Sequence, residues 1–166
     1  MATTTYVPIQ TQSLNGVSTV TFSSLGSYTD LYLVASNVTR GTANSCFIRF
    51  NSDTGSNYSY TQLVGNGSTA TSSRATNQTG IMVGNGTTGL SSTPTTILTQ
   101  IMNYSNATTY KTVLSRDTDS NGSTEAFVGL WRGSTGSATQ AITSITFYTA
   151  GNFTGGSVTL YGIVNA

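Results

Sequence analysis

The sequence predicts an all-β protein, folded as an antiparallel two-sheet sandwich of the jelly-roll kind. Charged residues make up only 7% of the 166 residues, and Thr, Ser, Asn and Gly, which favour strands and turns, replace them. Roughly eleven short segments rich in β-branched and aromatic residues recur at the spacing typical of a sandwich. No segment predicts a long crossover helix, so antiparallel sheets are expected. A Greek-key immunoglobulin-like sandwich is the alternative, although it normally has fewer strands.

The chain length suits one domain, and we treat residues 1–166 as a single β-sandwich. Residues 1–13 are expected to be an N-terminal arm or an edge strand, because Pro8 within Tyr6–Ser13 has no N–H to donate to a ladder. The Asn15-Gly16 pair that follows predicts a hairpin turn. Residues 17–23 then alternate apolar and polar side chains, which is the pattern of a half-buried strand.

The middle of the chain alternates between strand-like and loop-like segments. Asp30–Arg40 is apolar on both faces at first, so it is expected to be a central strand. Residues 97–104 fit either a strand or a helix, and the threonines of this region favour the strand. Further strands are expected at residues 45–50, 58–64, 81–83, 110–116 and 126–132, and loops at residues 65–79 and 84–96.

The C-terminal segment predicts one long hairpin that closes the sandwich. Residues 142–148 and 158–164 are rich in β-branched and aromatic residues, and they flank the Gly-rich loop at residues 151–156. The alternation of apolar and polar residues in the strands expected along the whole chain predicts a core that contains Phe22, Leu33, Ile48, Leu114, Ile145 and Leu160.

The composition argues against catalysis and against zinc binding. The chain has no His, which removes the commonest general base and the commonest zinc ligand. The single Cys46 is expected to be a small buried side chain. A glycosidase needs two carboxylates that face one cleft, and a pairing of Asp53 with Glu125 stays open. We therefore expect no catalytic residue, no metal and no cofactor, and we expect that the protein is not an enzyme.

The segment from Asp117 to Gly122, DTDSNG, matches the first half of a calcium-binding loop. An EF-hand would require Glu at position 128, where this chain has Val128, and helices on both flanks. A hairpin turn that uses Asp and Asn for local hydrogen bonds is the favoured interpretation. Trp131 and the Tyr side chains present a similar choice between stacking on sugars and packing in the core, and packing is favoured.

Charge and hydropathy argue against nucleic-acid binding and against a membrane-spanning segment. The net charge is +1 and the six basic residues are scattered singly, so nucleic-acid binding is not expected. No apolar run is long enough to cross a membrane. The first ten residues, MATTTYVPIQ, lack the basic and apolar regions of a signal peptide.

The chain carries, in this order, the motifs TYVPIQT, FSSLGSYTDLYLV, IRFNSDTGSNYSYTQLVGNGSTATSSR, MNYSNATTYKTVLSR, VGLWR, ITSIT and TLYGI. Together these motifs resemble a group of small tailed-bacteriophage proteins common in aquatic phages, with similarity from about Tyr6 to Ile163. The resemblance implies a β-sandwich virion component, either a capsid decoration (cement) protein or a tail-fibre and receptor-binding module. It supplies no catalytic residues.

The resemblance leaves two functions open. A decoration protein would stabilise the head by binding the major capsid protein, whereas a fibre domain would bind tail proteins or a host-surface glycan. Decoration is favoured, because strand-like sequence begins at Tyr6 and no heptad or collagen-like stalk precedes it. A secreted lectin is a third reading, which no export signal supports.

As a virion protein, the chain is expected on the capsid surface after assembly in the host cytoplasm. A homotrimer is expected from how virion sandwich proteins are usually arranged. The residues expected to contact a partner are Tyr6, Val7, Pro8 and Ile9, within an extended arm that adds to a neighbour's sheet edge. The alternative is that Tyr6–Ser13 is the first strand of its own sandwich.

Overall fold

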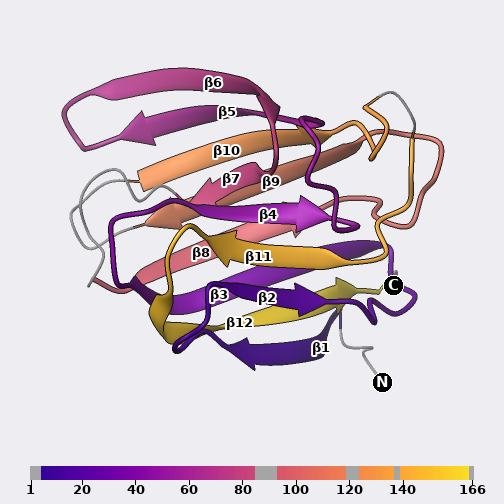
Figure 1. Cartoon of the computed structure of the whole chain (residues 1–166), viewed down its shortest axis with the longest axis horizontal. Coiled ribbons are helices and arrows are strands. Elements are labelled where there is room, and N and C mark those ends of the chain that lie inside the picture. The colour runs from indigo at the N-terminus through magenta and orange to yellow at the C-terminus, as the bar shows by residue number, and fades with distance from the viewer. Residues whose placement is uncertain (1–4, 85–92, 119–123, 137–138, 165–166) are drawn as a thin grey trace.

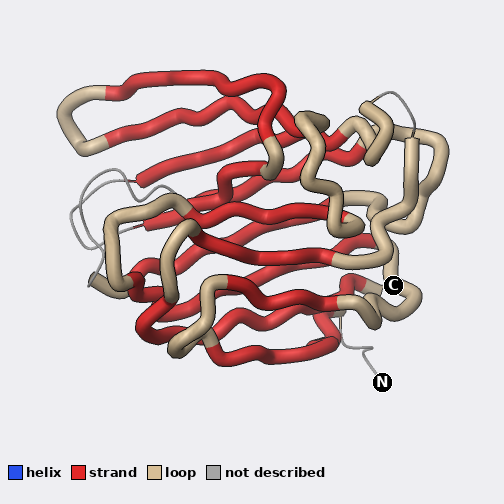
Figure 2. Tube along the Cα trace, in the orientation of Figure 1, coloured by secondary structure: helices blue, strands red, loops and turns tan. Residues whose placement is uncertain are grey.

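The computed structural model describes residues 5–84, 93–118, 124–136 and 139–164, and these form twelve β-strands and no helix (Figures 1 and 2). The strands are β1 (Tyr6–Ser13), β2 (Thr19–Phe22), β3 (Asp30–Arg40), β4 (Cys46–Phe50), β5 (Tyr58–Gly65), β6 (Ala70–Gln78), β7 (Ile81–Gly84), β8 (Thr95–Ile101), β9 (Lys111–Thr118), β10 (Thr124–Trp131), β11 (Ile145–Thr149) and β12 (Phe153–Ile163).

The strands form two antiparallel sheets that pack face to face. The larger sheet has eight strands in the order β1-β12-β3-β8-β9-β10-β5-β6, and the smaller has four in the order β2-β11-β4-β7. Figure 1 shows the smaller sheet in front of the larger one. The prediction of an all-β, antiparallel two-sheet sandwich is confirmed.

The connections explain the jelly-roll topology. The chain passes from one sheet to the other after β1, β2, β3, β4, β6, β7, β10 and β11. Two hairpins, β5–β6 and β9–β10, interrupt this alternation, and both join the larger sheet beyond β8. The structure is therefore an eight-stranded jelly roll in which two inserted hairpins extend one sheet by four strands. We call β9, β10, β5 and β6 the sheet extension.

Two predicted hairpins are wrong. β1 and β2 lie in different sheets, and so do β11 and β12. The two turns lie at the same end of the sandwich and bond to each other: Gly16 N donates to Phe153 O at 2.9 Å, and Phe153 N donates to Val17 O at 2.8 Å. The backbone N–H and C=O groups of the two turns are therefore hydrogen-bonded to each other. Each turn can then lead into a strand of the opposite sheet without leaving these groups unpaired.

The structure confirms two strand predictions and corrects one loop prediction. β3 lies inside the larger sheet, between β12 and β8, and residues 97–104 begin as a strand, β8. The predicted loop at residues 65–79 instead contains the nine-residue strand β6. β6 is an edge strand that is mostly exposed on both faces. Its side chains are polar except for two alanines, so the apolar alternation of a strand is missing.

The core lies between the two sheets and matches the prediction except at one residue. Phe22, Leu33, Ile48, Ile145 and Leu160 are buried, as expected. Leu114 is 50% exposed, so its predicted burial is wrong. On β9 the buried face carries Lys111, Val113, Ser115 and Asp117, and Leu114 points away from the core.

The difference in burial between the two faces of β9 can be tested by measuring the stability of two variants. Leu114→Ala is expected to lower the free energy of unfolding by less than about 1 kcal/mol, because a half-exposed side chain loses little burial. Val113→Ala, one residue earlier and 1% exposed, is expected to cost about 1–3 kcal/mol. Chemical denaturation of both variants checks this, and an equal loss would mean that β9 is inverted in solution.

Candidate binding surface

Most polar side chains inside the sandwich are engaged in internal hydrogen bonds, as the loop between β4 and β5 shows. Trp131 Nε1 donates to Asp53 Oδ2 at 2.7 Å. Asn57 Nδ2 donates to the same carboxyl group at 3.0 Å, and Gly55 N donates to Asp53 Oδ1 at 2.8 Å. Trp131 is only 1% exposed, so this side chain packs in the core and offers no face for sugar stacking.

Tyr58 connects this network to the aromatic core. Its ring stacks on Trp131 with centroids 6.3 Å apart, and Phe50 lies 5.5 Å from Trp131. The Tyr58 hydroxyl donates to Asp53 O at 3.0 Å and accepts from Phe50 N at 3.1 Å. Burial raises the pKa of Tyr58 above its ordinary value, so the hydroxyl stays protonated and structural.

Asp53 and Glu125 lie too far apart to form a glycosidase pair. Asp53 contacts Trp131 at the end of β10, and Glu125 lies six residues earlier on that strand, a separation of roughly 20 Å. Glu125 is instead the direct cross-strand neighbour of Asp117, and both are buried. Gln62 Nε2 donates to Glu125 Oε2 at 2.8 Å. The open pairing of Asp53 with Glu125 is therefore wrong.

The segment from Asp117 to Gly122 is described only in its first two residues, Asp117 and Thr118, which end β9. The rest of that segment lies outside the described residues. Among the residues that the structure describes, no three His, Cys, Asp or Glu side chains are grouped so that they could hold a metal ion.

A metal chelator is expected to leave the melting temperature unchanged. The hydrogen bonds around Asp53 and Glu125 come from protein groups and need no ion. Thermal unfolding with and without EDTA measures this. A fall in the melting temperature that added calcium reverses would contradict the expectation and make the Asp117 segment a metal site.

Cys46 is buried and its thiol lies beside Arg40. The thiol is 0% exposed, and Arg40 Nη1 lies 3.3 Å from its sulfur while donating to Asn44 O at 2.6 Å. Burial raises the pKa of Cys46 to about 11, against the smaller opposing effect of the Arg40 charge. The thiol is therefore protonated at neutral pH, as expected for a structural cysteine.

This environment predicts slow labelling of Cys46. Because the thiolate is the reactive form and the sulfur is covered, iodoacetamide at pH 8 is expected to modify the chain only after unfolding in guanidinium. Mass spectrometry would show one added label per unfolded chain, since Cys46 is the single cysteine. Rapid labelling of the folded protein would show that the β3–β4 end opens readily.

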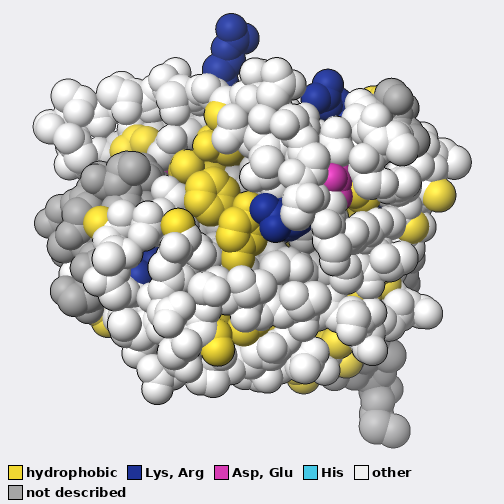
Figure 3. Space-filling model, viewed as in Figure 1, with side chains coloured by type: hydrophobic (Ala, Val, Ile, Leu, Met, Phe, Trp, Pro, Cys, Tyr) yellow, Lys and Arg dark blue, Asp and Glu magenta, His cyan; other side chains and the backbone are white. Residues whose placement is uncertain are grey.

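The outer face of the smaller sheet carries a row of large side chains. Phe47 and Tyr148 are cross-strand neighbours whose rings stack at 5.5 Å, and Met82 pairs with Phe47 on the other side. The Arg49 guanidinium lies 4.6 Å from the Tyr148 ring centre. Figure 3 shows this face, with hydrophobic side chains gathered across its middle. Gly80 is required beside this row, because a side chain there would collide with the Tyr148 hydroxyl.

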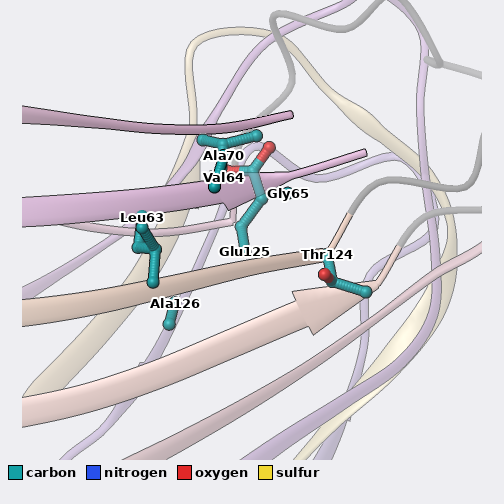
Figure 4. Close-up of a pocket in the computed structure, with 7 residues that line it drawn as sticks. All are labelled: Leu63, Val64, Gly65, Ala70, Thr124, Glu125 and Ala126. Carbon is teal, nitrogen blue, oxygen red and sulfur yellow. The ribbon is translucent and has the colours of Figure 1, made fainter. Parts of the chain in front are cut away.

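The outer face of the sheet extension exposes large apolar side chains. Leu63, Leu114 and Val128 are 54%, 50% and 57% exposed. Val128 pairs directly with Leu114, and Leu63 pairs with Ala126 on the same face. Figure 4 shows Leu63 and Ala126 on one side of the sheet and Glu125 on the other. We call Leu63, Leu114, Ala126 and Val128 the apolar centre.

Shallow grooves adjoin the apolar centre. One of about 140 Å³ lies over β8 and β9 beside Leu114, and one of about 270 Å³ lies over β10, β5 and β6 beside Val128. Two more, of about 220 and 250 Å³, meet at Thr124 and Glu125. All are smaller than typical small-molecule pockets of roughly 300–1,000 Å³. The larger Val128 groove is lined by Ser59, Tyr60, Thr61, Arg74, Ala75, Thr76, Thr112, Val128, Gly129 and Leu130.

The four residues predicted to contact a partner lie on β1, at the edge of the larger sheet. β1 pairs with β12 of its own chain, from Tyr6 opposite Ile163 to Ser13 opposite Ser157. This is the alternative in which Tyr6–Ser13 is the first strand of its own sandwich, and Thr3 and Thr4 of the expected arm lie outside the described residues. Tyr6 is 51% exposed and Pro8 is exposed, and the ladder is irregular after Pro8.

The apolar centre escaped sequence reasoning because its signal depends on strand register. Leu114 and Val128 each look like ordinary core residues of an alternating strand. Only the pairing of Val128 with Leu114, together with burial of the opposite face, shows that both point outward.

Comparison with known protein families and with curated proteins found no match to this sequence. Within the described part of the chain, no helix is long and apolar enough to cross a membrane.

Proposed function

We propose that this protein is a non-enzymatic structural component of a bacteriophage particle, a capsid decoration protein that binds the major capsid protein. The observation that carries the proposal is the contrast between interior and surface. Polar groups inside the sandwich, such as Asp53, Tyr58 and Gln62, are held in internal hydrogen bonds. The surface offers broad, weakly charged sheet faces that suit binding.

Such a surface fits attachment to a symmetric shell. Many shallow contacts repeated over a capsid give strong total attachment even where one contact is weak. A surface with few charges keeps these contacts largely insensitive to salt. In this proposal the exposed edge at Tyr6, Val7, Pro8 and Ile9 contacts a neighbouring subunit, and the protein resides on the capsid surface.

Gel quantification of purified particles tests the proposal. A decoration protein is expected at an abundance comparable with that of the major capsid protein, whereas a few copies per particle would indicate a fibre. Particles that lack the chain are expected to adsorb normally to cells and to burst more readily on heating. Loss of adsorption with normal head stability would overturn the decoration role.

A receptor-binding role in a tail fibre is the second candidate, and the groove beside Val128 favours it. The residues that line this groove include Arg74, four residues with hydroxyl side chains and the apolar residues Val128 and Leu130; the four are Ser59, Thr61, Thr76 and Thr112. An arginine can hold a carboxylate through two parallel hydrogen bonds, so an acidic sugar is the class of glycan that fits. Binding to a glycan array that Arg74→Gln abolishes would support this role over decoration.

A further inference from the structure

The turn between β5 and β6 surrounds one side-chain oxygen with hydrogen-bond donors. Asn66 Oδ1 accepts from Ser68 N at 3.0 Å and from Thr69 N at 2.8 Å. The hydroxyl groups of Ser68 and Thr69 donate to the same oxygen at 3.0 and 3.1 Å. Asn66 N donates to Thr69 O at 3.2 Å, which closes the turn and holds these donors in place.

The residue after Asn66 is a glycine with an open environment. Gly67 has a positive φ of 86°, and no atom lies within 4 Å of the point where a side chain would begin. Asn66 and Gly67 are both exposed, so water reaches the peptide nitrogen that joins them. Because glycine has no Cβ, no side chain of its own hinders the approach of this nitrogen to the Asn66 amide group.

We propose that Asn66 is a site of covalent modification, at which the side-chain amide is converted to an acid by attack of the Gly67 nitrogen. Water or hydroxide removes the proton of Gly67 N, which forms a bond to Asn66 Cγ while negative charge develops on Oδ1. The bond from Cγ to Nδ2 then breaks, and Nδ2 takes a proton from water and leaves as ammonia. A water molecule opens the resulting succinimide ring at either carbonyl carbon, which leaves aspartate or isoaspartate at this position.

The four hydrogen bonds favour this deamidation because they converge on the atom that becomes charged. Donors fixed at about 2.7–3.1 Å from a developing oxyanion stabilise it, as in the oxyanion hole of an enzyme. The donors to Asn66 Oδ1 lie at 2.8, 3.0, 3.0 and 3.1 Å. The turn therefore promotes attack on Cγ while leaving the attacking nitrogen accessible.

The other Asn-Gly pair among the described residues, Asn15-Gly16, is held differently. Gly16 N donates to Phe153 O at 2.9 Å, within the contact between two turns. Its nitrogen must give up this hydrogen bond before it can attack, so Asn15 is protected although its local sequence is the same. Two more Asn-Gly pairs, at residues 85–86 and 121–122, lie outside the described residues.

Asn106, between β8 and β9, has the same donors but no glycine after it. Its Oδ1 accepts from Thr108 N and Oγ1 at 2.6 and 2.9 Å, and from Thr109 N and Oγ1 at 3.0 and 3.3 Å. The next residue is Ala107, whose methyl group crowds the attacking nitrogen and restricts the backbone. Asn106 is therefore expected to react slowly in spite of its donors.

The two products have different effects on the β5–β6 hairpin. Aspartate keeps the backbone unchanged, and its carboxylate can accept from the same donors. Isoaspartate adds one carbon atom to the main chain, beside the Gly65–Ala70 pair that ends the β5–β6 ladder. Because β6 is an edge strand that pairs with β5, the isoaspartate form is expected to exchange its β6 amide hydrogens faster.

Peptide mapping by mass spectrometry of the purified chain, aged in mildly alkaline buffer, tests the proposal. Asn66 is expected to convert about tenfold faster than Asn15 and Asn106, the factor that one or two hydrogen bonds to the developing charge supply. A parallel sample unfolded in guanidinium removes the contribution of the fold. There Asn66 is expected to react more slowly than in the folded chain, and Asn15 faster, because Gly16 N is released from Phe153 O.

Two variants separate the donors from the glycine. Ser68→Ala combined with Thr69→Val removes both hydroxyl donors and is expected to slow the conversion of Asn66 about tenfold. Ala107→Gly places a glycine after Asn106 and is expected to make that residue a second rapid site. Circular dichroism shows whether each variant is folded, and Ala107→Gly remains a test if the double variant is not.

Three results would each overturn the proposal. The first is a slower reaction of Asn66 in the folded chain than in guanidinium, because the turn would then protect this residue. The second is an equal rate at Asn15 and Asn66 in the folded chain, which would mean that local sequence alone decides. The third is an unchanged rate at Asn66 in a folded double variant, or at Asn106 in a folded Ala107→Gly.

Discussion

Replacing Asp53 by alanine is expected to lower the free energy of unfolding by about 2–4 kcal/mol, because a buried donor loses its acceptor. Asp53 is 7% exposed, and its Oδ2 accepts from the indole of Trp131 at 2.7 Å. Trp131 is 1% exposed, so water cannot replace that acceptor without opening the core. Asn57 and the Gly55 backbone lose their acceptor as well. Chemical denaturation measures the loss.

A double-mutant cycle separates this hydrogen bond from general damage to the loop. Trp131→Phe removes the indole N–H, so Asp53→Ala is expected to cost less in that background by about 0.5–3 kcal/mol. Asp53→Asn is the conservative control, because its amide oxygen can still accept from Trp131. Strictly additive losses in the cycle would show that the Asp53–Trp131 bond contributes little.

The strands were largely predictable because most of them have one buried face. β2 shows this, since Val20 and Phe22 alternate with exposed threonines. β6 was not predictable, because an edge strand exposed on both faces has no apolar period. Local turn signals also failed, since Asn15-Gly16 marks a turn without specifying which sheet the next strand joins.

The faces of β9 were assigned wrongly for a related reason. The buried face carries Lys111 and Ser115, whose polar groups bond inside the protein: Lys111 Nζ donates to Thr109 O at 2.8 Å, and Ser115 Oγ donates to Val83 O at 2.9 Å. Burial lowers the pKa of Lys111. A polar residue can occupy the core once such partners exist. Thr109 is only two residues from Lys111, but Val83 is 32 residues from Ser115, and pattern reasoning does not see a partner that distant.

The binding surface depends on the same long-range information. The two inserted hairpins join one another in the order β9-β10-β5-β6, so residues far apart in sequence become neighbours. Gly129 shows how closely the smaller sheet approaches this extension, because a side chain there would collide with Ile81 on β7. The inner face of the extension is thus packed at β10, and its outer face is left with Leu63, Leu114 and Val128.

Leu160→Ala is expected to cost about 2–5 kcal/mol, since it removes a fully buried side chain and leaves a cavity. Leu160 is 0% exposed on β12, directly opposite Leu33, and β12 lies between β1 and β3. The loss is a large part of the roughly 5–15 kcal/mol that stabilises a typical domain.

The melting temperature of Leu160→Ala should fall by roughly 5–15 °C for a chain of this size. Leu63→Ala is the matched control, because it deletes the same atoms from a side chain that is 54% exposed on β5. That variant is expected to lose less than about 1 kcal/mol. An unchanged melting curve for Leu160→Ala would mean that β12 does not hold the N-terminal strand to the rest of the larger sheet. If Leu160→Ala destabilises β12 as expected, the amide hydrogens of β1 should exchange faster together with those of β12, because the two strands are hydrogen-bonded along their length.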